Sequence, residues 1–323
     1  MNRDPVRHDG FALVTVLWVL AILTVVAFGF SRRAMTERQA AWYLLDHAQA
    51  LHMARGAVER GVLELRNRTW VDRYYEQAGY TALNQRWARP VDLLVESDYY
   101  SASGDDAFRE DESSFVIRDC ESKIAINDVP EKLLRAIDAL DYAVVDALID
   151  LRTKRDPGDL PRRIRTLEEF RQLGDFDDAE WYGEAPGEAP GEGLRDLFTV
   201  WGDPARGRIN INTASLQVLN ALPDLDDVVV VELVAYRNGP DGLPQTRDDQ
   251  VFTSIGEVAS ILGLSAEKIQ PLREYCKTTS NYFTIEGHAT RRRGTINASC
   301  MAVVGVQDVQ VHILEWRETP IGS

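Results

Sequence analysis

Residues 11–30 have the sequence FALVTVLWVLAILTVVAFGF, which carries no charged side chain along its twenty residues. An α-helix rises 1.5 Å per residue, so about 20 apolar residues cross a hydrocarbon core of about 30 Å. A secretory signal peptide has a shorter apolar region followed by a small-x-small cleavage site, for which Ala27-Phe28-Gly29 is a weak candidate. The stretch therefore predicts a permanent membrane-spanning helix.

The segment after the span continues the helical pattern. Between Ser31 and Tyr74 there is no proline. Apolar residues recur there at helical spacing, at Leu44, Ala48, Leu51, Ala54, Val58, Val62 and Leu65. We expect one helix to leave the membrane with an apolar stripe along one side. Charge does not set its orientation, because two arginines and the terminal amine precede the span and three arginines follow it.

The composition of the whole chain disfavours several classes of function. The 323 residues allow about two domains besides an anchor, and 45% hydrophobic content is ordinary for a folded protein. A net charge of −15 and a pI near 4.8 are unlike those of a protein that neutralises phosphates. The sequence holds no G-x-S-x-G, H-E-x-x-H or Walker motif, and its five histidines are scattered. We do not expect an enzyme.

Three cysteines, Cys120, Cys276 and Cys300, are too few and too widely spaced for a disulfide scaffold or a zinc site. Because the count is odd, at least one thiol stays free. We expect three buried thiols that pack as small apolar groups. A bridge between Cys276 and Cys300 in an oxidising compartment is the alternative.

The middle of the chain contains a duplication. Residues 124–152 align without a gap to residues 209–237, with 11 of 29 positions identical. Each copy predicts a helix, a tight turn and a second helix, with Asn127 and Asn212 as N-cap residues. A further helix start follows each copy, at Leu167 after Thr166 and at Ile255 after Ser254.

The residues that flank the two copies have the pattern of strands. Two short strands are expected within residues 114–127. Three longer strands are expected at Tyr282–His288, Thr295–Val306 and Val309–Trp316. The arginines at 291–293 predict a solvated hairpin tip, with contact to an acidic neighbour as the alternative. The acidic tract GEAPGEAPGEG at 183–193 predicts a flexible loop without a function of its own.

The N-terminus resembles type IV pilins and pseudopilins, in which a short polar leader ends in glycine just before the apolar helix. Here the leader would be residues 1–10, ending at Gly10, and the mature chain would begin at Phe11. The resemblance implies that prepilin peptidase cuts between these two residues on the cytoplasmic side and methylates the new amino terminus.

The fifth mature position departs from the pattern of that class. Its members normally carry glutamate there, and this chain has Thr15. A carboxylate in the hydrocarbon costs on the order of a few kcal/mol unless it is paired. The hydroxyl of threonine can instead bond to a carbonyl one turn earlier in the helix. Loss of the glutamate is typical of the protein K family of the general secretion pathway, whose members sit at the filament tip.

A duplicated helical insertion in a pilin body is a second point of resemblance to that family. The fold implied is α+β: a long N-terminal transmembrane helix on an antiparallel sheet, with an inserted duplicated all-α domain of the helix-hairpin-helix or SAM-like type. The expected segments are the leader 1–10, the span 11–30, the periplasmic helix and first part of the body 31–122, the inserted domain 123–280 and the C-terminal sheet 281–323.

The implied function is that of a minor pseudopilin of a type II secretion system. It would cap the tip of the periplasmic pseudopilus and help to initiate its assembly for protein export. One span would hold it in the inner membrane with its body in the periplasm. By the same resemblance its partners are the I and J minor pseudopilins, the major pseudopilin and prepilin peptidase. The tip subunit of another type IV pilus is an alternative.

A membrane-tethered helix-hairpin-helix protein that binds DNA is the other alternative. Such hairpins have a Leu-Pro-Gly-x-Gly turn, because glycine lets the backbone approach a phosphate. The corresponding turns here are 222–226, LPDLD, and 137–141, IDALD. Both lack glycine and carry carboxylates that repel an anion. Nucleic acid is therefore not an expected partner.

One loop has the composition of a calcium site. Residues 238–250, NGPDGLPQTRDDQ, offer Asp241, Thr246, Asp248 and Asp249 as oxygen ligands, without the EF-hand spacing. Relatives in the protein K family resemble calcium binders, but many carry an Asp-rich run where this chain has three basic residues within 150–156, DLRTKRD. The alternative is a hydrogen-bonded polar turn. No other cofactor is expected.

Overall fold

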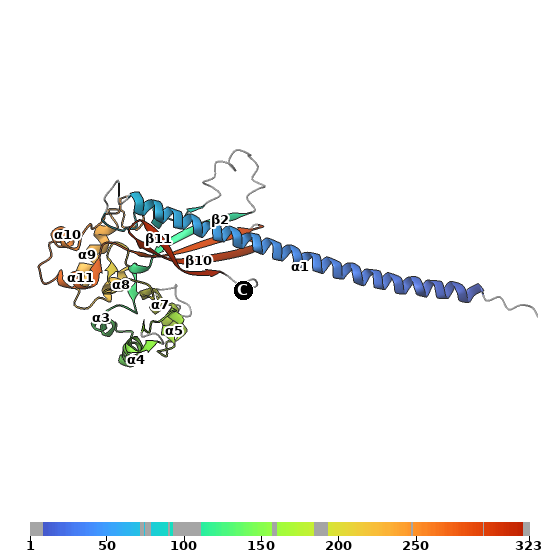
Figure 1. Ribbon diagram of the computed structural model, residues 1–323, viewed down its shortest axis with the longest axis horizontal. Coiled ribbons are helices and arrows are strands. Elements are labelled where there is room, and N and C mark those ends of the chain that lie inside the picture. The colour runs from blue at the N-terminus through green and yellow to red at the C-terminus, as the bar shows by residue number, and fades with distance from the viewer. Residues whose placement is uncertain are drawn as a thin grey trace, which may run out of the picture.

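A computed structural model describes residues 9–71, 74, 79–89, 91–92, 111–156, 160–183, 193–246, 248–292 and 294–318. The first eight residues of the expected leader and most of the acidic tract at 183–193 lie outside this described part. Figure 1 shows a long helix that projects from one end of a β-sheet, with a lobe of short helices at the opposite end.

Helix α1, Asp9–Val71, is a single element of 63 residues, which confirms the unbroken helix predicted from the sequence. Residues 13–45 are exposed along their whole length. Burial begins at Asp46 and includes the small side chains of Ala50, Ala54 and Ala57, which have no exposed surface. The buried stripe starts later than predicted, because the sheet does not extend as far as Leu44, which is 51% exposed.

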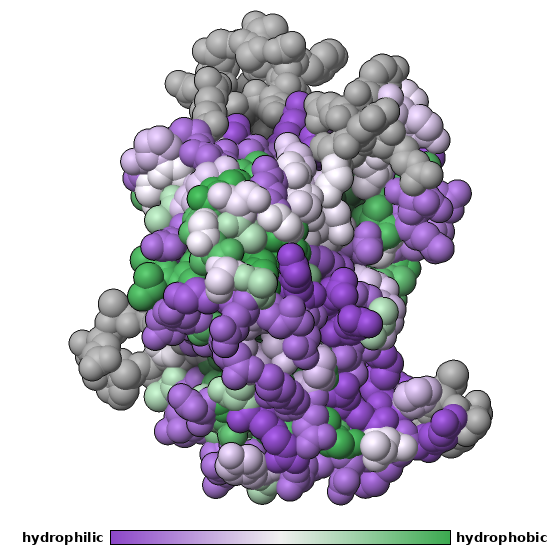
Figure 2. Space-filling model, turned by 90° about the vertical axis from the view of Figure 1, so that its left-hand side faces the viewer, coloured by the Kyte–Doolittle hydropathy of each residue, from purple (hydrophilic) through white to green (hydrophobic). Residues whose placement is uncertain are grey.

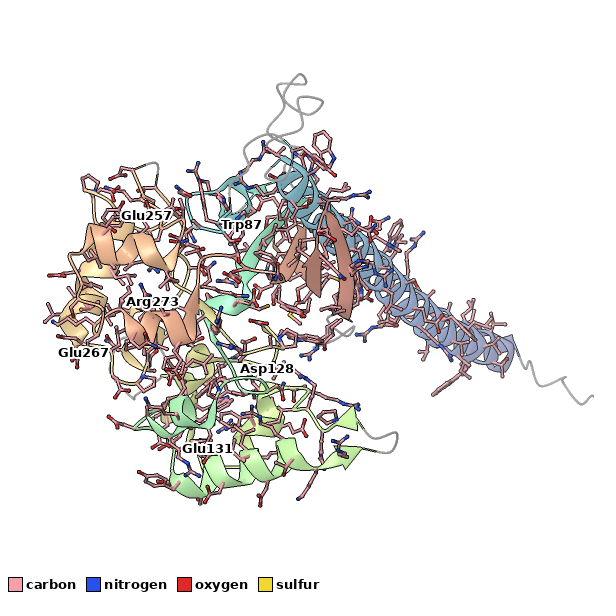
Figure 3. All side chains as sticks on the ribbon, turned by 60° about the vertical axis from the view of Figure 1, so that its left-hand side comes forward. Trp87, Asp128, Glu131, Glu257, Glu267 and Arg273 are labelled. Carbon is pink, nitrogen blue, oxygen red and sulfur yellow. The ribbon has the colours of Figure 1, made fainter. Side chains whose placement is uncertain are left out.

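The sheet has five antiparallel strands in the order β1-β2-β9-β10-β11. They are β1 Val91–Asp92, β2 Glu112–Asp119, β9 Tyr282–Arg291, β10 Ile296–Gln307 and β11 Gln310–Glu318. The three C-terminal strands of the prediction are confirmed, and α1 packs across one face of the sheet (Figure 1). Between helix and sheet lies an apolar core that includes Trp87, labelled in Figure 3. The rings of Trp87 and Phe283 meet there edge to face, with their centroids 5.2 Å apart.

A glycine sets the distance between α1 and the sheet. A Cβ on Gly287 in β9 would lie 2.4 Å from the Ala54 carbonyl oxygen and 2.8 Å from a methyl group of Val58. No side chain fits in that space, so the helix backbone rests directly on the strand. This close contact fixes the direction in which the exposed half of α1 leaves the body.

The lobe of short helices is inserted between β2 and β9 and has an apolar core of its own. Its first repeat contains η4 Cys120–Ser122, β3 Ile124–Ala125, α3 Glu131–Arg135, α4 Tyr142–Thr153, β4 Arg155–Asp156, β5 Leu160–Pro161, α5 Leu167–Arg171, α6 Asp178–Tyr182, α7 Leu194–Leu197 and β6 Phe198–Thr199. Its second repeat contains β7 Ile209–Asn210, α8 Leu216–Asn220, α9 Asp227–Arg237, α10 Ile255–Ile261, α11 Gln270–Tyr275 and β8 Cys276–Lys277. Both repeats therefore extend well beyond the 29 aligned residues.

Each repeat is closed by one pair of short parallel strands, β3 with β6 and β7 with β8. In each repeat, the residue that follows the first strand of the pair donates a hydrogen bond to the second strand. Ile126 N–H donates to Thr199 O, and Ile211 N–H donates to Lys277 O, both at 3.0 Å. Helices α5 and α10 begin at Leu167 and Ile255, as the sequence predicted, and the hydroxyls of Thr166 and Ser254 cap them.

The prediction that Asn127 and Asn212 are N-caps is wrong. Pro130 precedes α3, and the hydroxyl of Ser215 caps α8, because both helices begin later than the alignment indicated. Short loops lie between the asparagines and these helices, and the asparagine side chains point into the lobe instead.

Candidate functional site

The exposed half of α1 is the most distinctive surface of the molecule. Among the described residues, one helix is long and apolar enough to cross a membrane, and its most apolar stretch is entirely exposed. Trp18, Phe28 and Phe30 are each more than 60% exposed. Thr15 lies on this stretch, and Gly10 lies in the first turn of the same helix. An apolar surface of this length has no aqueous partner, so a lipid phase or other apolar helices must cover it.

The apolar surface of α1 continues beyond the length of one span. Arg32 and Arg33 follow the apolar stretch, and Trp42, Tyr43, Leu44 and Leu45 are all about half exposed. These four side chains occupy more than one face of the helix, as expected for a helix that contacts several neighbours.

Ion pairs fix α1 to the sheet where the exposed half ends. Asp46 lies 3.2 Å from Arg291 Nη1 and 2.6 Å from Arg292 Nη2, and Arg291 Nε bonds to Asp111 at 3.0 Å. The expected solvated hairpin tip is therefore wrong for Arg291, whose side chain is 19% exposed, and right for Arg292, which lies in the turn with a side chain that is 54% exposed. Both arginines pair with carboxylates of this chain because β9 and β10 bring the tip beside α1, and contact with an acidic neighbouring protein stays a prediction. Arg293 lies outside the described residues.

Asp119 forms the neck between sheet and helical lobe. It is the last residue of β2, and its side chain is buried. Its Oδ2 accepts hydrogen bonds from Thr213 Oγ1 at 2.6 Å, Ser280 Oγ at 2.6 Å and Asn210 Nδ2 at 3.2 Å. Burial raises the pKa of the carboxyl group, while the surrounding donors lower it. One side chain thus ties the second repeat to both strands at which the lobe is inserted.

A second carboxyl group lies two residues further on. Glu121 accepts hydrogen bonds from Lys277 Nζ at 2.7 Å and Asn281 N–H at 2.6 Å. Burial raises its pKa to about 7, although the charge of Lys277 acts in the opposite direction. Sequence analysis missed both carboxyl groups, because a lone acid at a strand end has no distinguishing pattern.

The two asparagines of the aligned segment form matched bonds, which we call the asparagine clamps. In the first repeat, the Asn127 side chain accepts from Ile164 N–H at 2.8 Å and donates to Ile164 O and Val200 O, both at 3.0 Å. In the second repeat, Asn212 accepts from Phe252 N–H at 3.0 Å. It donates to Phe252 O at 2.9 Å and to Thr278 O at 3.5 Å.

The aligned arginines also have matching roles. Arg152 donates to Val129 O at 2.9 Å, and Arg237 donates to the equivalent Ala214 O at 2.7 Å. The asparagines and arginines are identical between the copies because each satisfies backbone groups that the fold buries. Their identity in the alignment was a signal for these bonds.

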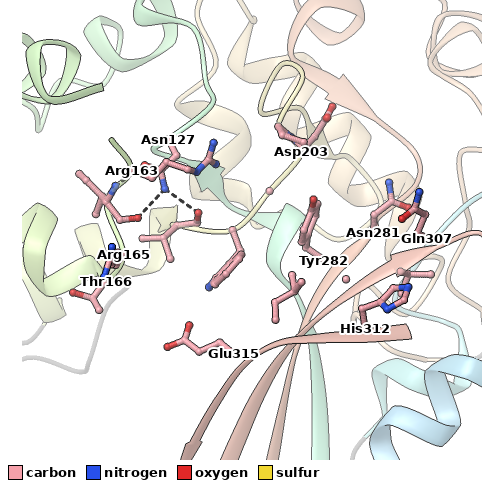
Figure 4. Close-up of a pocket in the computed structure, with 18 of the residues that line it drawn as sticks. Asn127, Arg163, Arg165, Thr166, Asp203, Asn281, Tyr282, Gln307, His312 and Glu315 are labelled. Carbon is pink, nitrogen blue, oxygen red and sulfur yellow. Dashed lines mark hydrogen bonds between the residues drawn. The ribbon is translucent and has the colours of Figure 1, made fainter. Parts of the chain in front are cut away.

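A cleft of about 1720 Å³ separates the first repeat from the sheet. One wall is formed by residues of the first repeat, including Arg165, Val200 and Trp201, and the other by residues of β10 and β11, including Leu314. Figure 4 shows the Asn127 clamp on one side of this space and His312 and Glu315 on the other.

The loop with calcium-like composition is held by its own hydrogen bonds. Thr246 Oγ1 donates to Asp248 Oδ1 at 2.7 Å and to Asp249 Oδ1 at 3.0 Å. Asp248 Oδ2 accepts from Asp241 N–H at 3.1 Å, and Asp241 Oδ1 accepts from Leu243 N–H at 2.8 Å. Within the described residues, no group of three or more His, Cys, Asp or Glu side chains is arranged to hold a metal. The geometry is that of a hydrogen-bonded polar turn, and the calcium site stays a prediction.

The three cysteines form no disulfide. All three cysteines are free and buried, as expected.

Asp224 adopts the left-handed conformation, with φ 61°, at the turn where DNA-binding hairpins have glycine. Its carboxylate pairs with Lys132 Nζ at 2.6 Å, so this turn presents a carboxylate side chain rather than bare backbone N–H groups.

Comparison with solved structures relates this architecture to a known assembly. No family model and no curated protein sequence matches the chain. A solved structure does match: a chain in the crystal structure of the GspK–GspI–GspJ complex of the type 2 secretion system from enterotoxigenic Escherichia coli. The match covers 89% of this chain and 99% of that one, with a TM-score of 0.51 and 15% sequence identity.

The chain has the fold of a chain in that GspK–GspI–GspJ complex. At this level of identity the likeness concerns the fold. It confirms the pilin-like α+β architecture with a long apolar N-terminal helix and an antiparallel sheet.

Proposed function

We propose that the chain is a minor pseudopilin of a type II secretion system. It is held in the inner membrane by residues 11–30, with its body in the periplasm, and it packs with the I and J minor pseudopilins and the major pseudopilin. The observation that carries this proposal is the single helix α1, whose exposed apolar half continues without a break into a half that is packed on the sheet. A cleavable signal or a core helix does not require such continuity.

A position at the tip of the filament follows from where the bulk of the molecule lies. The helical lobe is at the end opposite to the anchor (Figure 1). Figure 2 views that end, and polar residues cover most of the surface seen there. In a filament whose α1 helices pack side by side, a subunit added above this one would need the space that the lobe occupies. Thr15 also disfavours a further subunit above this one, because it offers no carboxylate to the amino terminus of that neighbour.

Maturation by prepilin peptidase is part of the same proposal. The enzyme would cut between Gly10 and Phe11 and methylate the new amino terminus. Amino-terminal mass spectrometry of the membrane-extracted chain tests this, with a methylated Phe11 as the expected result. An intact leader, or a product cut after Ala27, would contradict it. Loss of export on deletion of the gene, with rescue by the wild-type chain, tests the role in secretion.

Calcium binding by the 238–250 loop is a separate proposal. Because carboxylates can accept further ligands, Asp248 and Asp249 could exchange their bonds to Thr246 for a cation. Thermal melts with calcium and with chelator test it. Equal melting temperatures would leave the polar turn as the whole account of these residues.

A further inference from the structure

In the second repeat, a segment from outside the lobe lies across the residues that follow β8. Thr81 N–H donates to Thr278 O at 2.8 Å, and Ser280 N–H donates to Thr81 Oγ1 at 3.0 Å. Three residues later, Asn84 Nδ2 donates to Asp249 O at 3.4 Å. The short segment 81–84 therefore bridges the two stretches that the asparagine clamp of this repeat holds together.

The equivalent surface of the first repeat is open. Val200 of the first repeat is equivalent to Thr278 of the second, because each accepts the bond from the asparagine clamp of its own repeat. Two residues further on, Gly202 is therefore equivalent to Ser280. Both Val200 and Gly202 line the cleft. Among the bonds between described residues, none uses the Gly202 N–H group, whereas the Ser280 N–H group is bonded to Thr81. The first repeat thus presents the same backbone groups to the cleft, where no described residue is bonded to Gly202 N–H.

We propose that this cleft binds an extended polypeptide segment of a partner protein, in the manner in which residues 81–84 lie on the second repeat. A backbone N–H of the segment would donate to Val200 O, and a hydroxyl or carbonyl group would accept from Gly202 N–H. An apolar side chain would pack between Trp201 and Leu314, which line opposite walls. The proposal goes beyond the role in secretion and does not depend on it.

Charge specifies the segment further. Pro161 takes the position of Asp249, the residue that Asn84 contacts in the second repeat. Four residues after Pro161, the Arg165 guanidinium forms no ion pair or hydrogen bond with any described residue, whereas Arg163 is paired with Asp128 at 2.6 Å. Arg165 lines the same cleft as Pro161. The cleft also holds the carboxylates of Glu315, which is paired with Arg317, and Asp203, which accepts a hydrogen bond from Ala205 N–H. Arg165 is thus an unpaired cation in the cleft, and we place a carboxylate of the segment at the position of Asn84 to reach it.

Hydrogen exchange on the full chain in detergent micelles tests the proposal. The probes are two capped peptides: GYTALNQR, the sequence of residues 79–86, and GYTALDQR, in which aspartate replaces the asparagine. At millimolar concentration we expect GYTALDQR to slow amide exchange in residues 201–203 several-fold. We expect GYTALNQR to slow it less, and a scrambled peptide to have no effect. In the wild type the two peptides should differ by a factor of about 1.4 to 5, because a single exposed charge pair contributes about 0.2–1 kcal/mol. Arg165→Ala removes the cation, so the two peptides should then give equal protection.

Neighbouring residues of β11 supply a matched control. Leu314→Glu places a charge in the cleft, while Ile313→Glu changes the adjacent residue, which is 52% exposed and does not line the cleft. Protection at 201–203 should be lost in Leu314→Glu and kept in Ile313→Glu. The absence of protection with both peptides overturns the proposal. So does loss of protection in both variants or in neither.

Discussion

Asp119 Oδ2 and Ser280 Oγ are 2.6 Å apart, although 161 positions separate the two residues along the chain. The first ends β2, and the second lies two residues before β9 begins. Their hydrogen bond closes the neck through which the helical lobe is inserted into the sheet. The lobe is therefore held at a defined orientation rather than on a free linker.

Asp119→Asn should destabilise the chain by about 2–4 kcal/mol. A carboxamide has one acceptor oxygen, so it cannot serve the Glu121 N–H on one side and the Asn210 donor on the other. Urea denaturation of the full chain in detergent measures the loss. Asp138→Asn, at an exposed position, should change the free energy of unfolding by no more than about 0.5 kcal/mol. Equal effects of the two variants would show that the neck is not a stabilising contact.

Stability should fall as the pH rises from about 5 to about 8. The pKa of Glu121 is about 7 in the folded chain against an ordinary value of 4.5 for a glutamate, so folding favours the protonated form. This contribution is complete below the unfolded pKa and is lost as pH rises through about 7. The loss amounts to at most about 3 kcal/mol. The raised pKa of Asp119 acts in the same direction.

Glu121→Gln isolates the part of this pH dependence that belongs to Glu121. The variant cannot titrate, so its free energy of unfolding should vary less with pH than that of the wild type. Urea midpoints at several pH values measure both slopes. Identical slopes would assign the pH dependence to other groups.

Asn127→Ala and Asn212→Ala should each cost about 2–3 kcal/mol, because each leaves buried backbone groups without partners. The two losses should be similar, since the clamps make the same bonds in the two repeats. Asn297→Ala, on the exposed side of β10, is the control, with an expected change within about 0.5 kcal/mol. A clamp variant as stable as this control would contradict the assigned role.

The sequence predicted the parts of this fold that depend on periodicity. The length of α1, the three C-terminal strands and the duplication all follow from repeating patterns, and the structure contains all three. The parts it missed depend on contacts between distant residues. Asn127 was predicted as an N-cap because it precedes a helix, and its real partners lie 37 and 73 residues away. The neck at Asp119 and the pairing of Arg292 with Asp46 likewise join segments that no local pattern relates.

Gly287→Ala should destabilise the packing of α1 on the sheet by about 1–3 kcal/mol. The added methyl group would lie 2.4 Å from the Ala54 carbonyl oxygen, so helix and strand would have to separate. Gly79→Ala is the matched control, because a Cβ there meets no atom within 4 Å. Denaturation curves of the two variants test the difference. A Gly287→Ala variant as stable as the control would mean that α1 can shift away from β9 at no cost.

Thr15→Glu should change where the chain is found in assembled filaments. On the proposed cut after Gly10, the variant supplies a carboxylate at the fifth mature position, so a neighbouring amino terminus gains a partner in the hydrocarbon. Immunogold labelling of purified pseudopili should find the wild-type chain at filament ends and the variant also along the shafts. The fraction along the shafts should stay below that of the major subunit, because the helical lobe still occupies the space above.

Thr24→Glu is the control for this experiment. Thr24 lies deeper in the apolar stretch, where its hydroxyl donates to Leu20 O at 2.7 Å. A carboxylate at this depth has no amino terminus to pair with, so it should impair membrane insertion rather than alter the position of the chain in the filament. If Thr15→Glu inserts normally and its label stays at the ends, the missing carboxylate does not determine the tip position. The obstruction by the lobe would then be the remaining physical cause.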